Sequence, residues 1–143
     1  MGKKVNIGLI GTGRLGSMYA EFLVQRVPDA NVVAAADLFP DRVNSVSEKY
    51  DIPTQYDNHL DLINDGNVDA VIVVATTSNH KEIVIDAAKA GKSIFCEKPM
   101  TLDLKDAREM QTAIKQQGIF YQQGYMRRFD KSFAALKQKI DQG

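Results

Sequence analysis

The chain opens with a short apolar run that leads into three spaced glycines, VNIGLIGTGRLG from Val5 to Gly16. The run predicts a strand, and Gly11-x-Gly13-x-x-Gly16 is followed by residues with helical spacing, which is the context that makes this pattern specific. Gly11 allows a tight turn, Gly13 lets the backbone approach a pyrophosphate, and Gly16 lets the helix pack closely on the strand. The helix N-terminus then attracts the anion. A tight turn without a ligand is the alternative, but such a turn does not need all three glycines.

Short apolar runs alternate along the chain with segments that have helical spacing. Such continuous runs are typical of strands that are buried on both faces of a parallel sheet. The predicted strands are Val5–Ile10, Asn31–Ala36, Ala70–Ala75, Ser93–Cys96 and Ile119–Gln122, and the predicted helices are Leu15–Arg26, Asp41–Lys49, Leu60–Asn64, Lys81–Ala90 and Leu104–Gln117. This order predicts an α/β fold, a Rossmann-type doubly wound parallel sheet in a single three-layer αβα domain over residues 1–143. A ligand crevice is then expected at the carboxyl ends of the strands.

The ends of the predicted helices carry residues that favour helix termination or capping. Pro28 ends the first helix, and Gly91 and Gly118 stand where left-handed C-terminal caps belong. Asn79 and Glu82 have the spacing of a capping box, which places the start of the fourth predicted helix near Lys81.

A last helix is predicted after Asp130, which can cap it. Phe133, Leu136 and Ile140 form one apolar stripe on this helix. The stripe needs a cover, and two arrangements are open. Either it packs back on the sheet, or it faces a further domain that lies outside this chain.

Charge and composition narrow the class of partner. Acidic and basic side chains balance at 18 each without a long run of one sign, so the chain lacks the electrostatic signature of a protein that binds nucleic acid or anionic lipid. The 44% hydrophobic content of 143 residues suffices for one core. No segment approaches the roughly 20 apolar residues of a membrane span. Cys96 lies inside an apolar run and predicts a buried, inert thiol. We therefore expect a soluble cytoplasmic protein that has no membrane attachment and acts on a small molecule.

Asp37 ends the second predicted strand, about 20 residues beyond the glycine loop. An acidic side chain at this position can accept hydrogen bonds from the adenosine ribose hydroxyls of a dinucleotide. This favours NAD over NADP, since a 2′-phosphate would lie against the carboxylate unless a cation intervened. Arg42 could supply that cation. The alternative is that Asp37 is a turn or capping residue before Pro40, but the upstream glycine loop favours the ribose role.

Thr76, Thr77, Asn79 and His80 follow the run Ala70–Ala75, on a loop expected to pass beneath the nicotinamide-side ribose and the phosphates. Helix capping is an alternative for these residues, and for Asn79 it is at least as good an interpretation. His80 and His59 are too few and too far apart in the sequence for a metal site. We therefore expect no metal ion, and we assign neither histidine as the catalytic base.

Lys98 follows the run Ser93–Cys96, within the segment SIFCEKPMT, and so belongs to the same edge as the glycine loop. Oxidation of an alcohol by NAD removes a hydride from carbon and a proton from oxygen, so a side chain must receive that proton. A lysine does this only where its surroundings lower its pKa from about 10.4 toward 7 or 8. Glu97 opposes such a change because a nearby carboxylate stabilises an ammonium. The alternative is a surface lysine in a turn set by Pro99.

The segments GLIGTGRLG, FCEKPMT and GYMRRFD, together with Asp37, resemble the N-terminal half of the Gfo/Idh/MocA oxidoreductases. The resemblance spans nearly the whole chain, and GYMRRFD is most similar to the inositol 2-dehydrogenase branch. It implies an NAD or NADP Rossmann domain that is followed by a second α/β domain with an open antiparallel sheet. That second domain would supply substrate contacts and oligomer interfaces. We expect it to be absent from this chain.

The resemblance also assigns roles to individual residues. Lys98 would belong to a catalytic group with an aspartate and a histidine, and the histidine would be the usual proton acceptor. Met126 and Arg127 would lie beside the nicotinamide and the substrate, whereas Arg128 is interpreted as solvated. The expected cofactor contacts are Gly11, Gly13, Arg14, Leu15, Gly16, Asp37, Thr76, Asn79, His80, Glu97, Lys98, Met126 and Arg127.

These inferences favour the cofactor-binding half of an NAD-dependent oxidoreductase. The reaction would move a hydride between nicotinamide and a ring CH–OH of a cyclitol or sugar, as in inositol 2-dehydrogenase. The matching aspartate and histidine are not in the sequence, so we expect this chain alone to bind cofactor without turnover. The parent protein is expected to be a homo-oligomer through its second domain. A non-catalytic NAD-sensing module is the alternative from another class, and S-adenosylmethionine binding is a third, weaker one.

Overall fold

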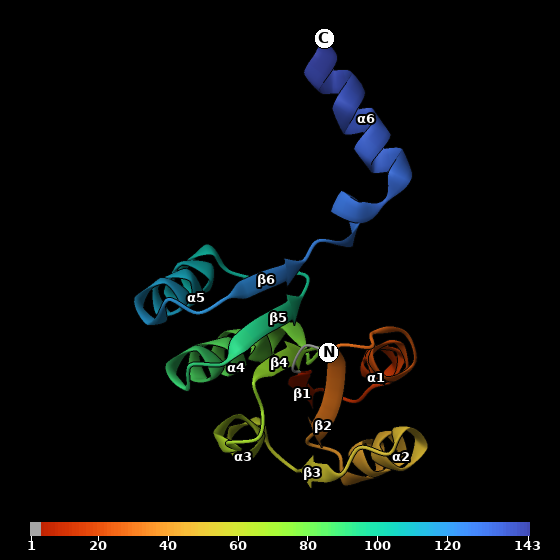
Figure 1. Cartoon of the computed structure of the whole chain (residues 1–143). Helices are drawn as coiled ribbons and strands as arrows, with labels where there is room; N and C mark the ends of the chain where they lie inside the picture. The colour runs from red at the N-terminus through yellow and green to blue at the C-terminus, as the bar shows by residue number, and fades with distance from the viewer. Residues whose placement is uncertain (1–3) are drawn as a thin grey trace.

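Strand β1 (Val5–Ile10) lies inside a six-stranded parallel sheet, with β2 on one side and β4 on the other (Figure 1). The computed structural model describes residues 4–143, so the first three positions of the predicted domain lie outside it. The strand order is β3-β2-β1-β4-β5-β6. The other strands are β2 (Ala30–Ala36), β3 (Thr54–Tyr56), β4 (Ala70–Val73), β5 (Ser93–Glu97) and β6 (Tyr121–Gly124). From β1 the sheet is built outward to β2 and β3 on one side, and the chain then crosses to β4, β5 and β6 on the other side. The strand order therefore reverses between β1 and β4, which is the topological switch point.

Helices cover both faces of the sheet, as the sequence predicted (Figure 1). One core contains β1 and β2 side chains packed against α1 (Arg14–Arg26) and α2 (Pro40–Tyr50). The opposite core packs the sheet against α3 (His59–Asn64), α4 (Thr77–Lys89) and α5 (Leu104–Gln117). Lys81 joins α4 to α5 through ion pairs with Asp106 and Glu109. This three-layer arrangement confirms the predicted doubly wound α/β fold.

The boundaries of several strands differ from the prediction. The sequence analysis missed β3, a three-residue edge strand whose residues are only partly buried or exposed and which has no apolar run. Strand β4 ends at Val73, two residues earlier than predicted, and β6 is shifted two residues toward the C-terminus. A strand ends where its backbone leaves the hydrogen-bonded ladder, and the pattern of side chains predicts that point only to within one or two residues.

Most of the predicted helix ends are confirmed, with one exception. Gly118 is a left-handed C-cap with φ 62°, and Gly91 has φ 72° after α4. The capping box at Asn79 and Glu82 is wrong, because α4 already begins at Thr77. Thr76 is the N-cap residue, but its side chain makes no capping hydrogen bond. The helix therefore starts four residues before the predicted position.

Helix α6 (Lys131–Gln142) follows a short 3₁₀ segment, η1 (Met126–Phe129), and extends away from the sheet (Figure 1). The Asp130 carboxylate caps it, as predicted, by accepting hydrogen bonds from the backbone of Ser132 and Phe133. The predicted stripe is exposed, with Phe133 at 49%, Leu136 at 56% and Ile140 at 67%. The arrangement in which this stripe packs back on the sheet is therefore wrong. Within residues 4–143 no helix is both long and apolar enough to cross a membrane.

The glycine loop brings α1 into contact with the end of β1. A Cβ atom at Gly16 would lie 1.9 Å from the carbonyl oxygen of Gly11, a backbone atom that no side-chain rotation can move. Gly11 itself has φ 94°, which a residue with a side chain adopts only at a cost. A Cβ atom at Gly13, by contrast, would meet no atom within 4 Å. Two of the three glycines are thus required by the fold, and the third is not.

We expect Gly16→Ala to lower the free energy of unfolding by about 3 kcal/mol or more, because the added methyl group displaces α1 from β1. The matched variant Gly13→Ala should cost only about 1 kcal/mol, because Ala is a poorer N-cap residue than Gly but its methyl group would meet no atom within 4 Å. Urea unfolding of both variants, followed by circular dichroism, measures the difference. Equal losses would contradict the contact with Gly11 as the reason for glycine at position 16.

Candidate active site

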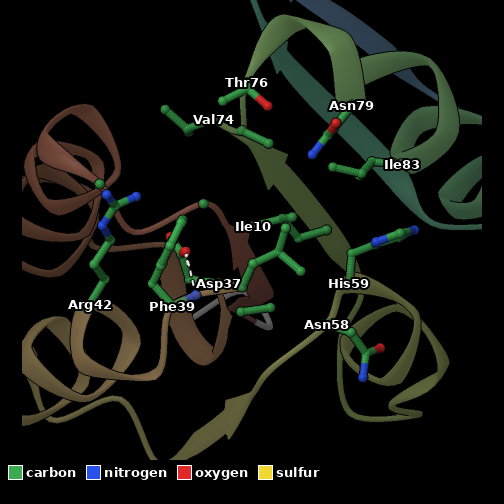
Figure 2. A pocket seen from close by; sticks show the side chains of 15 residues that line it. Ile10, Asp37, Phe39, Arg42, Asn58, His59, Val74, Thr76, Asn79 and Ile83 are labelled. Carbon is green, nitrogen blue, oxygen red and sulfur yellow. Dashed lines mark hydrogen bonds between the residues drawn. The ribbon is translucent and has the colours of Figure 1, made fainter.

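The carboxyl ends of β1, β2 and β4 surround a cavity of about 270 Å³ beside the switch point (Figure 2). Of the predicted site residues, the structure brings Gly11, Gly13, Asp37, Thr76 and Asn79 together around it. The cavity is also lined by Ile10, Ala36, Leu38, Phe39, Arg42, Asn58, His59, Val74, Ala75 and Ile83. Mostly apolar walls with a few polar groups are typical of a site for a small molecule or cofactor.

Asp37 connects the end of β2 to the glycine loop. Its Oδ2 atom accepts hydrogen bonds from the Thr12 backbone N–H at 2.7 Å and from the Thr12 hydroxyl at 3.0 Å. Its Oδ1 atom accepts one from the Phe39 N–H at 3.0 Å. An ionised carboxylate offers about four acceptor positions, so Asp37 retains capacity for a donor on a ligand. The sequence analysis did not foresee Thr12, which is buried at 3% exposure in the middle of the glycine loop.

Arg42 and Phe39 lie next to Asp37 on the side of the cavity that faces α2 (Figure 2). The Arg42 guanidinium stacks over the Phe39 ring, 4.1 Å from its centroid. Such a contact fixes the direction of the cation without neutralising it. A positive charge therefore stands near the Asp37 carboxylate, as the sequence analysis allowed.

Asn58 and His59 form the opposite wall and were not predicted as site residues (Figure 2). They follow β3, the strand that the sequence analysis missed. Recognition of β3 would have shown that its carboxyl end also reaches this edge.

His59 lies close to two carboxylates. Its Nε2 atom lies 3.1 Å from the Asp86 carboxylate, and Glu82 offers a third possible metal-ligand atom within 4.8 Å of these two. The expected absence of a metal ion stays a prediction.

Three of the four residues that were predicted to lie on a loop after β4 lie in a helix, and only Thr76 precedes it. Thr77, Asn79 and His80 belong to the first turn of α4. The Oδ1 atom of Asn79 accepts a hydrogen bond from the Ser78 hydroxyl at 3.2 Å. His80 is 1% exposed, and its ring nitrogens lie 2.9 Å from the Pro99 carbonyl oxygen and 3.0 Å from that of Ala75. Both ring nitrogens of His80 thus face backbone carbonyl oxygens, and the predicted contact between His80 and a cofactor stays a prediction.

A second, more open cavity of about 840 Å³ lies beside the loop that follows β5. The structure brings Lys98, Met126 and Arg127 together there, as the sequence analysis expected of residues near a nicotinamide. Gly124 and Tyr125 at the end of β6 line the same cavity. Arg127 is oriented by Asp130, whose carboxylate is 3.3 Å from its guanidinium, and by the ring of Phe133. The predicted site residues that line a cavity are thus divided between these two cavities.

The remaining predicted contacts differ in accessibility. Arg14 and Leu15 lie in the first turn of α1, where both are exposed, and Gly16 is buried against Gly11. Glu97 is only 7% exposed. Its Oε1 atom accepts a 2.5 Å hydrogen bond from the Tyr19 hydroxyl, and its Oε2 atom accepts one from the Lys98 backbone N–H at 2.9 Å. Within residues 4–143 the Lys98 ammonium forms no ion pair with Glu97 or with another carboxylate.

Cys96 precedes this loop and is fully buried. Burial raises the pKa of its thiol to about 12, the nearby Glu97 charge adds to the increase, and a hydrogen bond with Tyr121 opposes it. The thiol form therefore predominates at pH 8, whereas the thiolate is the reactive form.

We expect the native chain to resist a maleimide at pH 8 and the urea-unfolded chain to react at once, because only unfolding exposes the Cys96 thiol; mass spectrometry measures the labelling. Rapid labelling of the native chain would contradict this burial.

Comparison with known proteins identifies the family. Residues 5–125 match the model of the GFO/IDH/MocA oxidoreductase family, described by its NAD-binding Rossmann fold. The chain is 40% identical to myo-inositol 2-dehydrogenase of Thermotoga maritima over 97% of its length, and 38% identical to scyllo-inositol 2-dehydrogenase (NAD(+)) of Bacillus subtilis over 100%. It superposes with a TM-score of 0.93 and 32% identity on scyllo-inositol dehydrogenase of Lactobacillus casei with bound NAD(H) and scyllo-inositol, covering 99% of this chain.

The chain spans less than half of the length of these relatives. It spans 41% and 42% of the two curated relatives, and 42% of the Lactobacillus casei chain. The matched part contains the glycine loop, Asp37 and the Glu97-Lys98-Pro99 segment, all within residues 5–125. The chain belongs to the GFO/IDH/MocA oxidoreductase family and comprises its NAD-binding Rossmann fold.

Proposed function

We propose that this chain is the cofactor-binding half of an NAD-dependent oxidoreductase that transfers a hydride between nicotinamide and a ring CH–OH of a cyclitol or sugar. The observation that carries this proposal is the arrangement at the sheet edge. Asp37 with the glycine loop lines one cavity, and Lys98 lines the cavity beside it. The inositol dehydrogenases among the relatives support a cyclitol as the substrate class.

The residues present fit a dinucleotide. The backbone at Gly13 has open space where a side chain would stand, and α1 begins directly after it, so a pyrophosphate could be held by the helix N-terminus. The free acceptor capacity of Asp37 suits the adenosine ribose hydroxyls. Bound NAD would supply the hydride acceptor. NADP is disfavoured by the Asp37 carboxylate, although Arg42 stands nearby.

Lys98 would contact the substrate oxygen or the nicotinamide ribose and support removal of the hydroxyl proton. The family resemblance assigns final acceptance of that proton to a histidine, and a neighbouring aspartate completes the group. Met126 and Arg127 would border the same space. In the parent protein these partners would come from a second α/β domain that also covers the stripe Phe133, Leu136 and Ile140 on α6. We further propose that the parent protein is a cytoplasmic homo-oligomer.

We expect Asp37→Ala to weaken NAD binding about 10- to 100-fold, because it removes charge-assisted hydrogen bonds to the ribose. Binding of NADP should change little or improve. Isothermal titration calorimetry with both nucleotides measures this difference. Thr12→Val is the control, since it removes the Thr12 hydroxyl that bonds to Asp37 and leaves the carboxylate in place. If Thr12→Val weakened NAD binding as much as Asp37→Ala, the role of Asp37 would be to shape the loop and not to bind ribose.

We expect this chain to bind NAD but to form no NADH from myo-inositol, because the proton-accepting histidine of the resemblance is not among its residues. An absorbance assay for NADH, run beside the calorimetric titration, tests both parts. Binding that is retained in Lys98→Ala would agree with a role of this lysine in chemistry. Steady NADH formation by the chain alone would contradict the proposal that turnover needs a histidine from outside this chain. Absence of NAD binding would contradict the cofactor role itself.

A further inference from the structure

A chain of hydrogen bonds leads from helix α1 to Lys98. Tyr19 lies on α1, and its hydroxyl donates to the Glu97 Oε1 atom at 2.5 Å. The Oε2 atom of the same carboxylate accepts the Lys98 backbone N–H at 2.9 Å. Tyr19 and Glu97 are 78 residues apart in the sequence, so the contact joins two elements that only the fold brings together. Sequence analysis gave Tyr19 no role.

Glu97 and its partner Tyr19 also contact neighbouring residues of β5 and β6. A Cβ atom at Gly124 would lie 3.3 Å from the Glu97 carboxyl carbon, so glycine at this position leaves room for the carboxylate. The Gln123 side-chain amide donates to the Glu97 carbonyl oxygen at 2.7 Å. The Tyr19 ring packs against Phe95, with centroids 5.7 Å apart and planes at 52°. The ring of Tyr19 is therefore positioned by Phe95, independently of its hydroxyl.

The Tyr19 hydroxyl remains a donor at neutral pH. Burial is the main reason that the pKa of Tyr19 is raised above its ordinary value, and the hydrogen bond to Glu97 and its negative charge add to the increase. A buried carboxylate is costly unless it accepts hydrogen bonds, and within residues 4–143 the Tyr19 hydroxyl is one of the two donors to the Glu97 carboxylate. Loss of this hydroxyl would leave one carboxylate oxygen without its partner.

We propose that Tyr19 is a positioning residue for Lys98 and acts through the Glu97 carboxylate. With one oxygen bonded to Tyr19 and the other to the Lys98 backbone N–H, the carboxylate holds the Lys98 backbone in place. Helix α1 also carries the glycine loop at its start, so the same helix would receive the dinucleotide and set the position of the lysine. The proposal rests on the proposed function, in which Lys98 takes part in proton removal.

The other side of Lys98 is held separately. The Pro99 carbonyl oxygen lies 2.9 Å from the Nδ1 atom of His80, which is buried in α4. Removal of the Tyr19 hydroxyl should therefore release the Glu97 side of Lys98 while the Pro99 side stays in place. A local change at Lys98 is expected, without loss of the loop.

The test compares Tyr19→Phe with Tyr50→Phe. The first variant keeps the ring that packs on Phe95 and removes only the hydroxyl. Tyr50 on α2 likewise donates its hydroxyl to a glutamate, Glu21 on α1, at 3.1 Å, but this glutamate does not bond to Lys98. In Tyr19→Phe we expect hydrogen exchange of the Lys98 amide to accelerate at least about tenfold and the Lys98 side-chain ¹³C resonance to move, both measured by NMR. Tyr50→Phe should change neither.

Binding of NAD, measured by calorimetry, should stay within about threefold in both variants. Unchanged Lys98 signals in Tyr19→Phe would overturn the proposal, and so would equal changes in Tyr50→Phe. If Tyr19→Phe failed to fold, Glu97→Gln would replace it, because the amide of Gln has one acceptor oxygen and cannot accept from both Tyr19 and the Lys98 N–H, so the Lys98 signals should change as well. Failure of the wild-type chain to bind NAD would count against the proposed function, whereas the Lys98 signals test the positioning role alone.

Discussion

The close contact between Gly16 and the Gly11 carbonyl fixes the positions of α1, of the glycine loop and of the strand ends at the sheet edge. It allows α1 to begin directly beyond β1, so that the helix N-terminus and the backbone of the loop face the same crevice. Asp37 then binds that loop through Thr12, which fixes the end of β2 relative to the end of β1. The glycine loop is thus a packing device first, and its suitability for an anion follows from that packing.

The carboxylates of Asp37 and Glu97 each have a structural role in addition to their proposed functional role. Asp37 holds Thr12 and Phe39 while it retains capacity for a ligand, and Glu97 holds the backbone of Lys98 while it is itself held by Tyr19. For this reason a substitution at either carboxylate changes the shape of the site as well as its charge. Variants that remove a single hydroxyl, such as those at Thr12 and Tyr19, separate these two effects better than removal of the carboxylate does.

The sequence was most informative where one residue type is demanded by local geometry. The glycine loop, the apolar runs and Asp37 predicted the parallel sheet, its ligand edge and the first cavity, because each depends on a few neighbouring residues. Strand β3 escaped prediction because it is short and lies at the edge, and Asn58 and His59 were missed with it. The burial of His80 among backbone carbonyls could not be predicted because it depends on the loop after β5, which is distant in the sequence. The contact between Tyr19 and Glu97 could not be predicted either, because the two residues are 78 positions apart.

The place of β1 in the strand order has a consequence for how this chain folds. Strand β1 pairs with β2 on one side and with the later strand β4 on the other, and the Asn6 to Asp69 contact beside it joins residues 63 positions apart. Until β4 has been made, one edge of an apolar strand has no partner. Pairing over such separations is slow, since loop closure must precede the gain from the contact. The centre of the sheet is therefore completed late, and nascent chains that end before β4 would present an open strand edge to a chaperone or to one another.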